Sequence, residues 1–208
     1  MKIAVLERNS VGTDIDVTCF EDFGEVTYYR NTVAADAAEK VKDVDIIIAN
    51  KAPMNEETLK DAPNVKLICE FATGFDNIDL EYCKKRGIKV ANVKDYSTAA
   101  VAQHTFALAF YLLEHLPYYD TYVKDGSYGA QDRFSHFDLS FTELAGKTWG
   151  IIGMGNIGRM VAKIATAFGC KVIFHSVTGK STCTEYEQVS KDELLAQSDI
   201  LSLHCPLS

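Results

Sequence analysis

The stretch from Leu144 to Ser176 constrains the fold of this chain most, and at its centre residues 153–158 spell G-x-G-x-x-G. An apolar run, Thr148 to Ile152, precedes the glycines, and a helical pattern ending near Phe168 follows them. In this context the first glycine allows a tight turn, the second lets a pyrophosphate approach the backbone, and the third lets the helix pack on the strand. The pattern predicts a phosphate-binding strand–loop–helix unit, with a ligand-free glycine turn as the alternative.

Length and charge restrict the kind of protein. A chain of 208 residues with 47% hydrophobic residues suits one large or two small domains with a full core. The formal net charge of −8 argues against a nucleic-acid or anionic-membrane partner, because neither would be attracted over long range. No apolar stretch of membrane-spanning length occurs, and Glu7 interrupts the N-terminal apolar run too early for a signal peptide. We therefore expect a cytoplasmic protein.

The six cysteines are scattered, with no C-x-x-C pair and no histidine at metal-ligand spacing. Cys69 and Cys170 lie in or beside apolar runs, where a reduced, buried thiol is the simpler interpretation. We expect neither disulfides nor a metal site.

Strand patterns alternate with helical patterns through about the first 92 residues. Such alternation predicts a parallel sheet covered on both faces. Bacterial receiver domains share it, but they need an acidic cluster at strand ends to hold magnesium, and here only Glu7 follows the first strand. That alternative is therefore disfavoured. The expected strands are 2–6, 26–29, 45–49, 65–70 and 87–91, and the expected helices are 34–41, 56–61 and 80–86.

The longest expected helix runs from Ser97 to Leu116, with Ser97 or Thr98 as its cap and Pro117 as its end. It is apolar nearly all round, which predicts a buried helix between two α/β units. Residues 118–143, which follow it, lack a clear period and are rich in aromatics. A loop packed on its own domain and a subunit interface are both open for this segment.

The second unit has expected strands at 148–152, 171–175 and 199–204 and expected helices at 157–168 and 191–197. A dinucleotide-binding fold has two β-α-β-α-β halves, and this pattern accounts for the first. The last strand would lack its later neighbours, so we expect a truncated chain or an incomplete record.

Five motifs occur in a family's order across essentially the whole chain. Together they resemble the D-isomer-specific 2-hydroxyacid dehydrogenases, most closely the glycerate dehydrogenase or hydroxypyruvate reductase-like branch. The motifs are Asn50–Pro53, Ala72–Asp79, Tyr96–Ser97 leading into Val101–Thr105, Glu143–Thr148 before the glycines, and Leu203–Leu207.

The resemblance implies an α/β protein in which a flavodoxin-like substrate domain, residues 1–98, precedes an incomplete Rossmann domain, residues 99–208. The active site would lie in the cleft between them. Backbone N–H groups of Thr73, Gly74 and Phe75 would receive the substrate carboxylate, which needs no net charge. A strand-to-helix turn capped by Asp76 or Asn77 is the structural alternative for this loop.

Two further side chains are expected at the substrate. Lys51 would add a positive charge, and a solvated loop lysine is its alternative. Tyr96 would donate its hydroxyl into the cleft, and packing at the hinge is its alternative. The family's catalytic histidine–carboxylate pair and arginine lie beyond the segment matching Cys205–Pro206, so we assign no catalytic residue in this sequence. His104, His175 and His204 are interpreted as structural.

The implied chemistry is hydride transfer between NAD(P)H and C2 of a small 2-ketoacid such as hydroxypyruvate or glyoxylate. NAD-preferring members place an aspartate where this chain has Ser176, and hydroxyls with a nearby lysine can bind a 2′-phosphate. NADP is therefore expected to be accepted and modestly favoured over NAD, unless Ser176 is merely permissive and Lys180 solvated. The expected cofactor contacts are Thr105, Gly153, Gly155, Asn156, Ile157, Gly158, Ser176, Thr178, Lys180, Cys205 and Pro206.

Family members are usually homodimers joined through their nucleotide domains, which the long helix and the aromatic segment fit. The chain as given is expected to bind better than it catalyses. A non-catalytic dinucleotide-binding module and an inert remnant of such an enzyme are the alternative functions.

Overall fold

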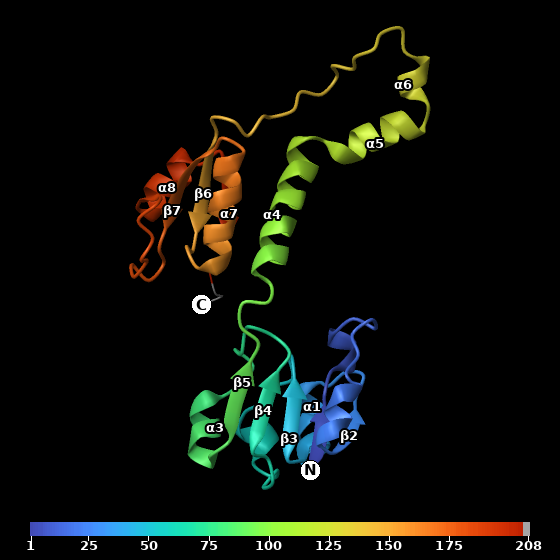
Figure 1. The fold of residues 1–208 in the computed structure, drawn as a ribbon, viewed down its shortest axis with the longest axis vertical. Helices are drawn as coiled ribbons and strands as arrows, with labels where there is room; N and C mark the ends of the chain where they lie inside the picture. The colour runs from blue at the N-terminus through green and yellow to red at the C-terminus, as the bar shows by residue number, and fades with distance from the viewer. Residues whose placement is uncertain (206–208) are drawn as a thin grey trace. The chain divides into compact units, whose positions relative to one another are not determined.

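The computed structural model describes residues 1–205 and divides the chain into two compact units, Met1–Tyr96 and a second that begins at Ser97 (Figure 1). Each unit has its own parallel sheet and its own cluster of buried apolar residues. The division falls two residues before the boundary expected from the sequence.

The first unit is built on a five-stranded sheet in the order β2-β1-β3-β4-β5. All neighbours are parallel, and Ala4, Ile47, Ile68 and Val90 share one register across four of the strands. This order is that of flavodoxin-like sheets and confirms the predicted fold class. The strands are β1 (Lys2–Val5), β2 (Glu25–Tyr28), β3 (Ile46–Ala49), β4 (Leu67–Glu70) and β5 (Lys89–Asn92).

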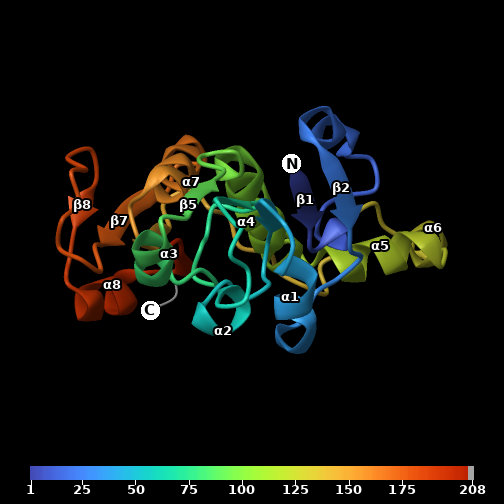
Figure 2. The same cartoon turned by 90° about the horizontal axis from the view of Figure 1, so that it is seen from below.

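Three helices, α1 (Ala34–Val41), α2 (Glu56–Leu59) and α3 (Leu80–Arg86), lie on one side of this sheet (Figure 2). Their buried residues join the sheet in one apolar cluster. A second cluster around β1 uses the 3₁₀ helix Thr18–Phe23, whose Phe20 ring lies 6.0 Å from that of Phe71. The sheet is therefore covered on both faces, as expected. Three α-helices cover one face, and the 3₁₀ helix covers β1 on the other.

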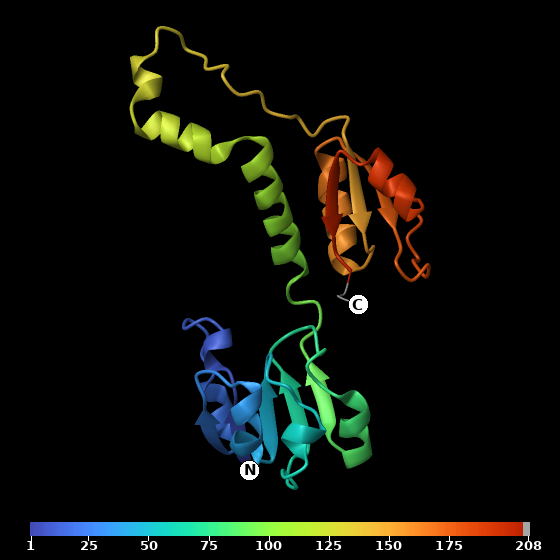
Figure 3. The same cartoon turned by 180° about the vertical axis from the view of Figure 1, so that it is seen from behind.

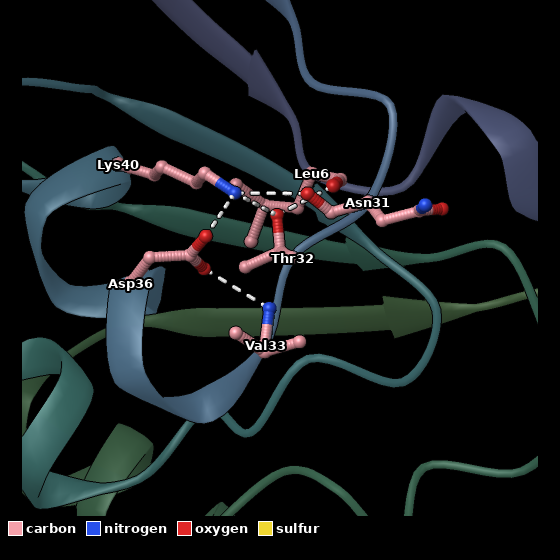
Figure 4. A network of polar contacts seen from close by, with 6 residues as sticks. All are labelled: Leu6, Asn31, Thr32, Val33, Asp36 and Lys40. Atoms are coloured by element: carbon pink, nitrogen blue, oxygen red, sulfur yellow. Dashed lines mark hydrogen bonds and ion pairs between the residues drawn. The ribbon is translucent and has the colours of Figure 1, made fainter.

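Figure 4 shows how the start of α1 is tied to the end of β1. Val33 precedes the helix and has no side-chain acceptor, but Asp36 Oδ1 accepts its N–H at 3.0 Å. Lys40 Nζ pairs with Asp36 Oδ2 at 2.8 Å and donates to Thr32 Oγ1 at 3.2 Å. The Thr32 hydroxyl donates in turn to the carbonyl of Leu6. These polar contacts fix the chain just before Glu7.

The second unit contains a four-stranded parallel sheet in the order β8-β7-β6-β9. Two helices, α7 (Asn156–Ala167) and α8 (Lys191–Gln197), lie on opposite faces of it (Figure 3). This order corresponds to strands 3-2-1-4 of a dinucleotide-binding sheet, so the chain holds the first half and the first strand of the second. The expected strand at 199–204 is therefore not the third strand of the first half, because β9 pairs with β6 on the side opposite β7. The two-residue strand β8 was not predicted, because Glu187 and Gln188 give no apolar signal. The strands are β6 (Thr148–Ile152), β7 (Lys171–His175), β8 (Glu187–Gln188) and β9 (Ile200–Leu203).

The end predicted for the long helix is wrong. Helix α4 (Thr98–Leu113) stops before His115, whose φ of 50° breaks the helical path. Pro117 instead lies in the first turn of α5 (Leu116–Lys124), where its missing N–H costs nothing. A further short helix, α6 (Ser127–Ala130), follows, so the first part of the aromatic segment is helical rather than a loop.

The burial predicted for α4 is also wrong within this chain. Ala102 and Phe106 are buried against α7 and β6, but the side chains of Tyr111 and Leu112 are 52% and 69% exposed. A helix that is apolar all round needs cover on every side, and the described residues of the second unit cover one side only. An apolar face of α4 is left open.

Phe106 gives a direct test of the α4 packing. Its ring centroid lies 4.7 Å from that of Trp149, the only tryptophan, which is fully buried. We expect Phe106→Ala to lower the free energy of unfolding of the second unit by about 3 kcal/mol, through lost burial and a cavity. Urea unfolding followed by Trp149 fluorescence measures this.

Leu195→Ala is the control for that substitution, because it removes a side chain that is 51% exposed on α8. Its effect should be well below that of Phe106→Ala. Equal unfolding midpoints for wild type and Phe106→Ala would contradict the packing described.

Candidate functional site

The glycine loop connects β6 to α7. Gly155 occupies the position before the first helical residue and offers no side-chain acceptor to the N–H groups of the first turn. Neighbouring strands end at the same place, because the N–H of Gly153 donates to the carbonyl of His175 at 3.0 Å and that of His204 to the carbonyl of Ile152 at 2.7 Å. The carboxyl ends of β7, β6 and β9 therefore lie side by side where the glycine loop leads into α7.

The three glycines differ in what a side chain would meet. A Cβ on Gly153, whose φ is +95°, would lie 2.6 Å from the carbonyl oxygen of His204. A Cβ on Gly158 would collide with the carbonyl oxygen of Gly153, so the helix approaches the loop as closely as a glycine permits. At Gly155 nothing lies within 4 Å. The first and third glycines are thus required by the chain itself, whereas the second borders open space.

The loop after β7 carries hydroxyls and positive charge. Ser176 is half-buried, Thr178 and Lys180 are exposed, and the Lys180 N–H donates to Thr178 Oγ1 at 3.4 Å. Arg159, from the first turns of α7, reaches this loop and donates to Thr182 Oγ1 at 3.2 Å. Sequence reasoning missed Arg159, although a cation directly after the third glycine was available as a signal.

The remaining expected cofactor contacts lie in different surroundings. Thr105 is half-buried on α4, and its hydroxyl donates to the Val101 carbonyl at 2.8 Å. Cys205 directly follows His204, and its N lies 2.9 Å from where a Cβ on Gly153 would be. Pro206 lies outside the described residues.

The three histidines interpreted as structural have distinct environments. His104 is exposed on α4, and His175 Nδ1 lies 3.2 Å from the Val189 carbonyl oxygen. Burial lowers the pKa of His204, and its Nε2 has no partner among residues 1–205.

In the first unit, the loop Thr73–Phe75 follows β4 and is held from the side of β5. Thr73 Oγ1 donates to the Val93 carbonyl at 2.9 Å, and Asn92 Nδ2 donates to the Thr73 carbonyl at 2.7 Å. No acceptor from residues 1–205 takes the backbone N–H groups of Thr73, Gly74 or Phe75. The loop is exposed, so these three donors can reach a ligand.

The capping alternative for this loop is wrong in detail. The helix that follows, α3, is capped by Asp79, whose Oδ1 accepts the N–H of Tyr82 at 2.9 Å. Asp76 and Asn77 were the residues proposed for that role, and they lie too early in the chain. The loop is therefore longer than a tight turn, which leaves Asn77 able to bind elsewhere.

Lys51 lies on a loop after β3 that is held by Glu7. One oxygen, Glu7 Oε2, accepts the N–H groups of Asn50 at 2.7 Å, Lys51 at 2.8 Å and Ala52 at 3.1 Å. Glu7 is 8% exposed, whereas the Lys51 side chain is exposed. The sequence drew attention to Glu7 as the end of the N-terminal apolar run and as an isolated acidic residue after the first strand, so its contacts with this loop were missed.

Asn77 and Glu70 complete the substructure. Asn77 Nδ2 donates to the Ala52 carbonyl at 3.0 Å and to Glu70 Oε2 at 3.3 Å, which joins the Lys51 loop to the Thr73–Phe75 loop. Glu70, the last residue of β4, is 2% exposed, and its burial raises its pKa to about 7. A glutamate ending an apolar strand run was the available signal for this missed residue.

Tyr96 is the last residue of the first unit and is 62% exposed in the described chain. The residues singled out therefore form two groups, one on each unit: the loops of Lys51 and Thr73–Phe75 on the first, and those of Gly153–Gly158 and Ser176 on the second.

Within residues 1–205, no group of three or more His, Cys, Asp or Glu side chains is arranged to hold a metal ion. In the same part of the chain, no helix combines the length and apolar character needed to cross a membrane. The six cysteines are free thiols, and Cys83, Cys170 and Cys183 are buried.

Comparison with known proteins points to one family. The sequence model of "D-isomer specific 2-hydroxyacid dehydrogenase, catalytic domain" matches residues 3–196. A hydroxypyruvate reductase of Blautia hydrogenotrophica is 37% identical over the whole chain, which covers 66% of that relative. The chain thus spans about two thirds of the length of such relatives.

Solved structures show the same similarity. A D-lactate dehydrogenase from Aquifex aeolicus, complexed with NAD and lactic acid, matches with a TM-score of 0.78 and 31% identity over 100% of this chain and 61% of its own. An acyclic imino acid reductase in complex with NADPH and D-Arg matches with a TM-score of 0.85 and 29% identity, over 100% and 66% of the two chains. These two neighbours were each solved with a nicotinamide dinucleotide bound.

The glycines provide a matched pair of variants. Gly155→Ala places its methyl group in open space at an ordinary φ of −81°, so the fold should persist while dinucleotide binding weakens at least about tenfold. Gly158→Ala should lower both stability and binding, because its Cβ meets the loop carbonyl. Calorimetry with NADPH and NADH, alongside thermal unfolding, measures both. Unchanged affinity in Gly155→Ala would show that the pyrophosphate does not lie at this glycine.

Proposed function

Since the chain belongs to the D-isomer specific 2-hydroxyacid dehydrogenases, we propose that the complete protein transfers a hydride between NAD(P)H and a small 2-ketoacid such as hydroxypyruvate or glyoxylate. The observation that carries the proposal is that one chain holds both an open glycine loop at a helix start and a loop with three unclaimed backbone donors. The first suits a dinucleotide and the second a carboxylate.

On the substrate side, the N–H groups of Thr73, Gly74 and Phe75 would bind the carboxylate of the ketoacid. Lys51 would add a positive charge from the loop that Glu7 holds, and Tyr96 would donate its hydroxyl. Backbone donors suit this role because they are fixed by the fold and carry no net charge to be neutralised. A protein with a net charge of −8 needs such local donors to hold an anion.

On the cofactor side, the nicotinamide ring supplies the hydride when the dinucleotide is bound. The backbone of Gly153, Gly155 and Gly158 would admit the pyrophosphate, and the N–H groups of Asn156 and Ile157 would donate to it. Thr105, Cys205 and Pro206 would line the same site. The open space at Gly155 supports this arrangement, because it is where a phosphate needs room.

We propose a modest preference for NADP. An aspartate after β7 would repel a 2′-phosphate, whereas the hydroxyls of Ser176 and Thr178 with the Lys180 ammonium can bind one. The exposure of Thr178 and Lys180 supports this role.

No residue of this chain is proposed as the catalytic acid, base or carbonyl-polarising group. By resemblance to the family, those residues follow the segment that matches Cys205–Pro206. The 208-residue chain alone should therefore bind a dinucleotide without turning over substrate. Separately, the protein is proposed to work in the cytoplasm.

The function is tested with the complete protein by following oxidation of NADPH and NADH in the presence of hydroxypyruvate or glyoxylate. We expect turnover with at least one of the two acids and tighter calorimetric binding of NADPH. Dinucleotide binding without turnover on any small 2-ketoacid would favour a non-catalytic module instead. Binding of NADH at least about tenfold tighter than NADPH would contradict the cofactor preference.

We also propose a homodimer joined through the second unit. Leu108, Tyr111 and Leu112 form an exposed apolar face on α4, and Phe134 and Phe137 are 89% and 75% exposed. A contiguous exposed apolar face such as that on α4 is typical of an interface. Light scattering should give the mass of a dimer, and Leu112→Lys should shift it towards a monomer, whereas Leu195→Lys on α8 should not. A clean wild-type monomer would contradict the interface.

A further inference from the structure

Glu70 is the most incompletely satisfied carboxyl group near the substrate loops. It ends β4 and directly precedes the segment that leads to Thr73–Phe75, and it is 2% exposed. Its Oε2 accepts from Asn77 Nδ2 at 3.3 Å, and its Oε1 has no partner among residues 1–205. Asn77 Oδ1 likewise has none. Burying a carboxylate with a single amide donor costs far more free energy than burying the neutral, protonated carboxyl group.

The charged groups that act on Glu70 come from three loops. Glu7, after β1, and Asp76, in the substrate loop, both disfavour a negative charge on Glu70, whereas Lys51, after β3, favours it. Burial is the largest effect and raises the pKa of Glu70 to about 7, against an ordinary value of 4.5. Ionised and neutral forms of Glu70 therefore coexist near neutral pH.

The same carboxyl group is connected to both anion-binding elements. Through Asn77 it is joined to the carbonyl of Ala52, next to Lys51, and through the chain it is joined to the Thr73–Phe75 loop. A negative charge on Glu70 would oppose an incoming carboxylate and would compete with it for the field of Lys51. A neutral Glu70 would do neither.

We propose that Glu70 is a positioning residue of the carboxylate site: neutral Glu70 lets the Thr73–Phe75 loop bind a substrate carboxylate tightly, and ionised Glu70 weakens that binding. The inference rests on the proposed function of this loop. By linkage, carboxylate binding is accompanied by proton uptake at Glu70, so affinity falls as the pH rises through neutrality.

Glu70→Gln is the matching variant, since an amide reproduces the neutral group in size and supplies a donor for the unpaired Asn77 Oδ1. Glu70→Met keeps the volume without a polar group. Glu81→Gln, on an exposed residue of α3, is the control.

The test measures binding of oxamate, a 2-ketoacid analogue that accepts no hydride, to the dinucleotide-saturated complete protein between pH 6 and 8. From pH 6 to pH 8, the affinity of wild type and of Glu81→Gln for oxamate should fall by about a factor of ten more than that of Glu70→Gln and Glu70→Met. In turnover, KM for the ketoacid should rise with pH in wild type more than in Glu70→Gln, whereas the pH dependence of kcat should differ little between them. Parallel pH profiles for wild type and Glu70→Gln would overturn the inference. An enzyme that binds oxamate but reduces no 2-ketoacid would instead contradict the proposed function.

Unfolding gives an independent measurement on the same variants. Because the folded-state pKa of Glu70 lies above its ordinary value, ionisation favours the unfolded chain as the pH rises from about 4.5 to about 7. The unfolding midpoint of Glu70→Gln should therefore gain on that of wild type between pH 5 and pH 8. A constant difference would show that Glu70 does not titrate in this range and would also overturn the inference.

Discussion

The close approach of α7 to its preceding loop, between Gly158 and the carbonyl of Gly153, fixes where the helix begins relative to the glycine loop of the second unit. Because no side chain separates them, the helix begins close to the end of β6. The end of β7 accepts a hydrogen bond from Gly153 of this loop, and His204, which follows β9, donates to Ile152 at the end of β6. Of the three glycines in this loop, Gly155 is the one that borders open space. The proposed pyrophosphate site is thus a consequence of close backbone packing.

In the first unit, a buried carboxylate shapes the loop that is proposed to bind an anion. Glu7 gathers three successive N–H groups onto one oxygen and so shapes the loop that presents Lys51. Asn77 then connects this loop to the one containing Thr73, while Glu70 remains beneath with one oxygen unpaired. Two carboxyl groups therefore support loops that are proposed to bind an anion. Their hydrogen bonds hold the loops in place, whereas their negative charges would repel the anion.

The sequence predicted what local patterning controls. The bounds of α1, α3, α8, β6 and β7 agree with the expected ranges, because each has a clear apolar period between turn residues. Sequence-based prediction failed where contacts with residues distant in the sequence determine the structure. Pro117 is compatible with both a helix end and a helix start, and the burial of α4 depends on what covers it. The partners of Glu7 and Glu70 are far away in sequence, so no local pattern revealed them.

One chain is thus proposed to present a pyrophosphate site at the glycine loop and a carboxylate site at the Thr73–Phe75 loop. A crystal structure of the complete protein with NADPH and oxamate tests it most directly. We expect pyrophosphate oxygens within hydrogen-bond distance of the N–H groups of Asn156 and Ile157, and the oxamate carboxylate on those of Gly74 and Phe75. If the oxamate carboxylate bound elsewhere and the N–H groups of the Thr73–Phe75 loop faced solvent, the proposed carboxylate site would be contradicted.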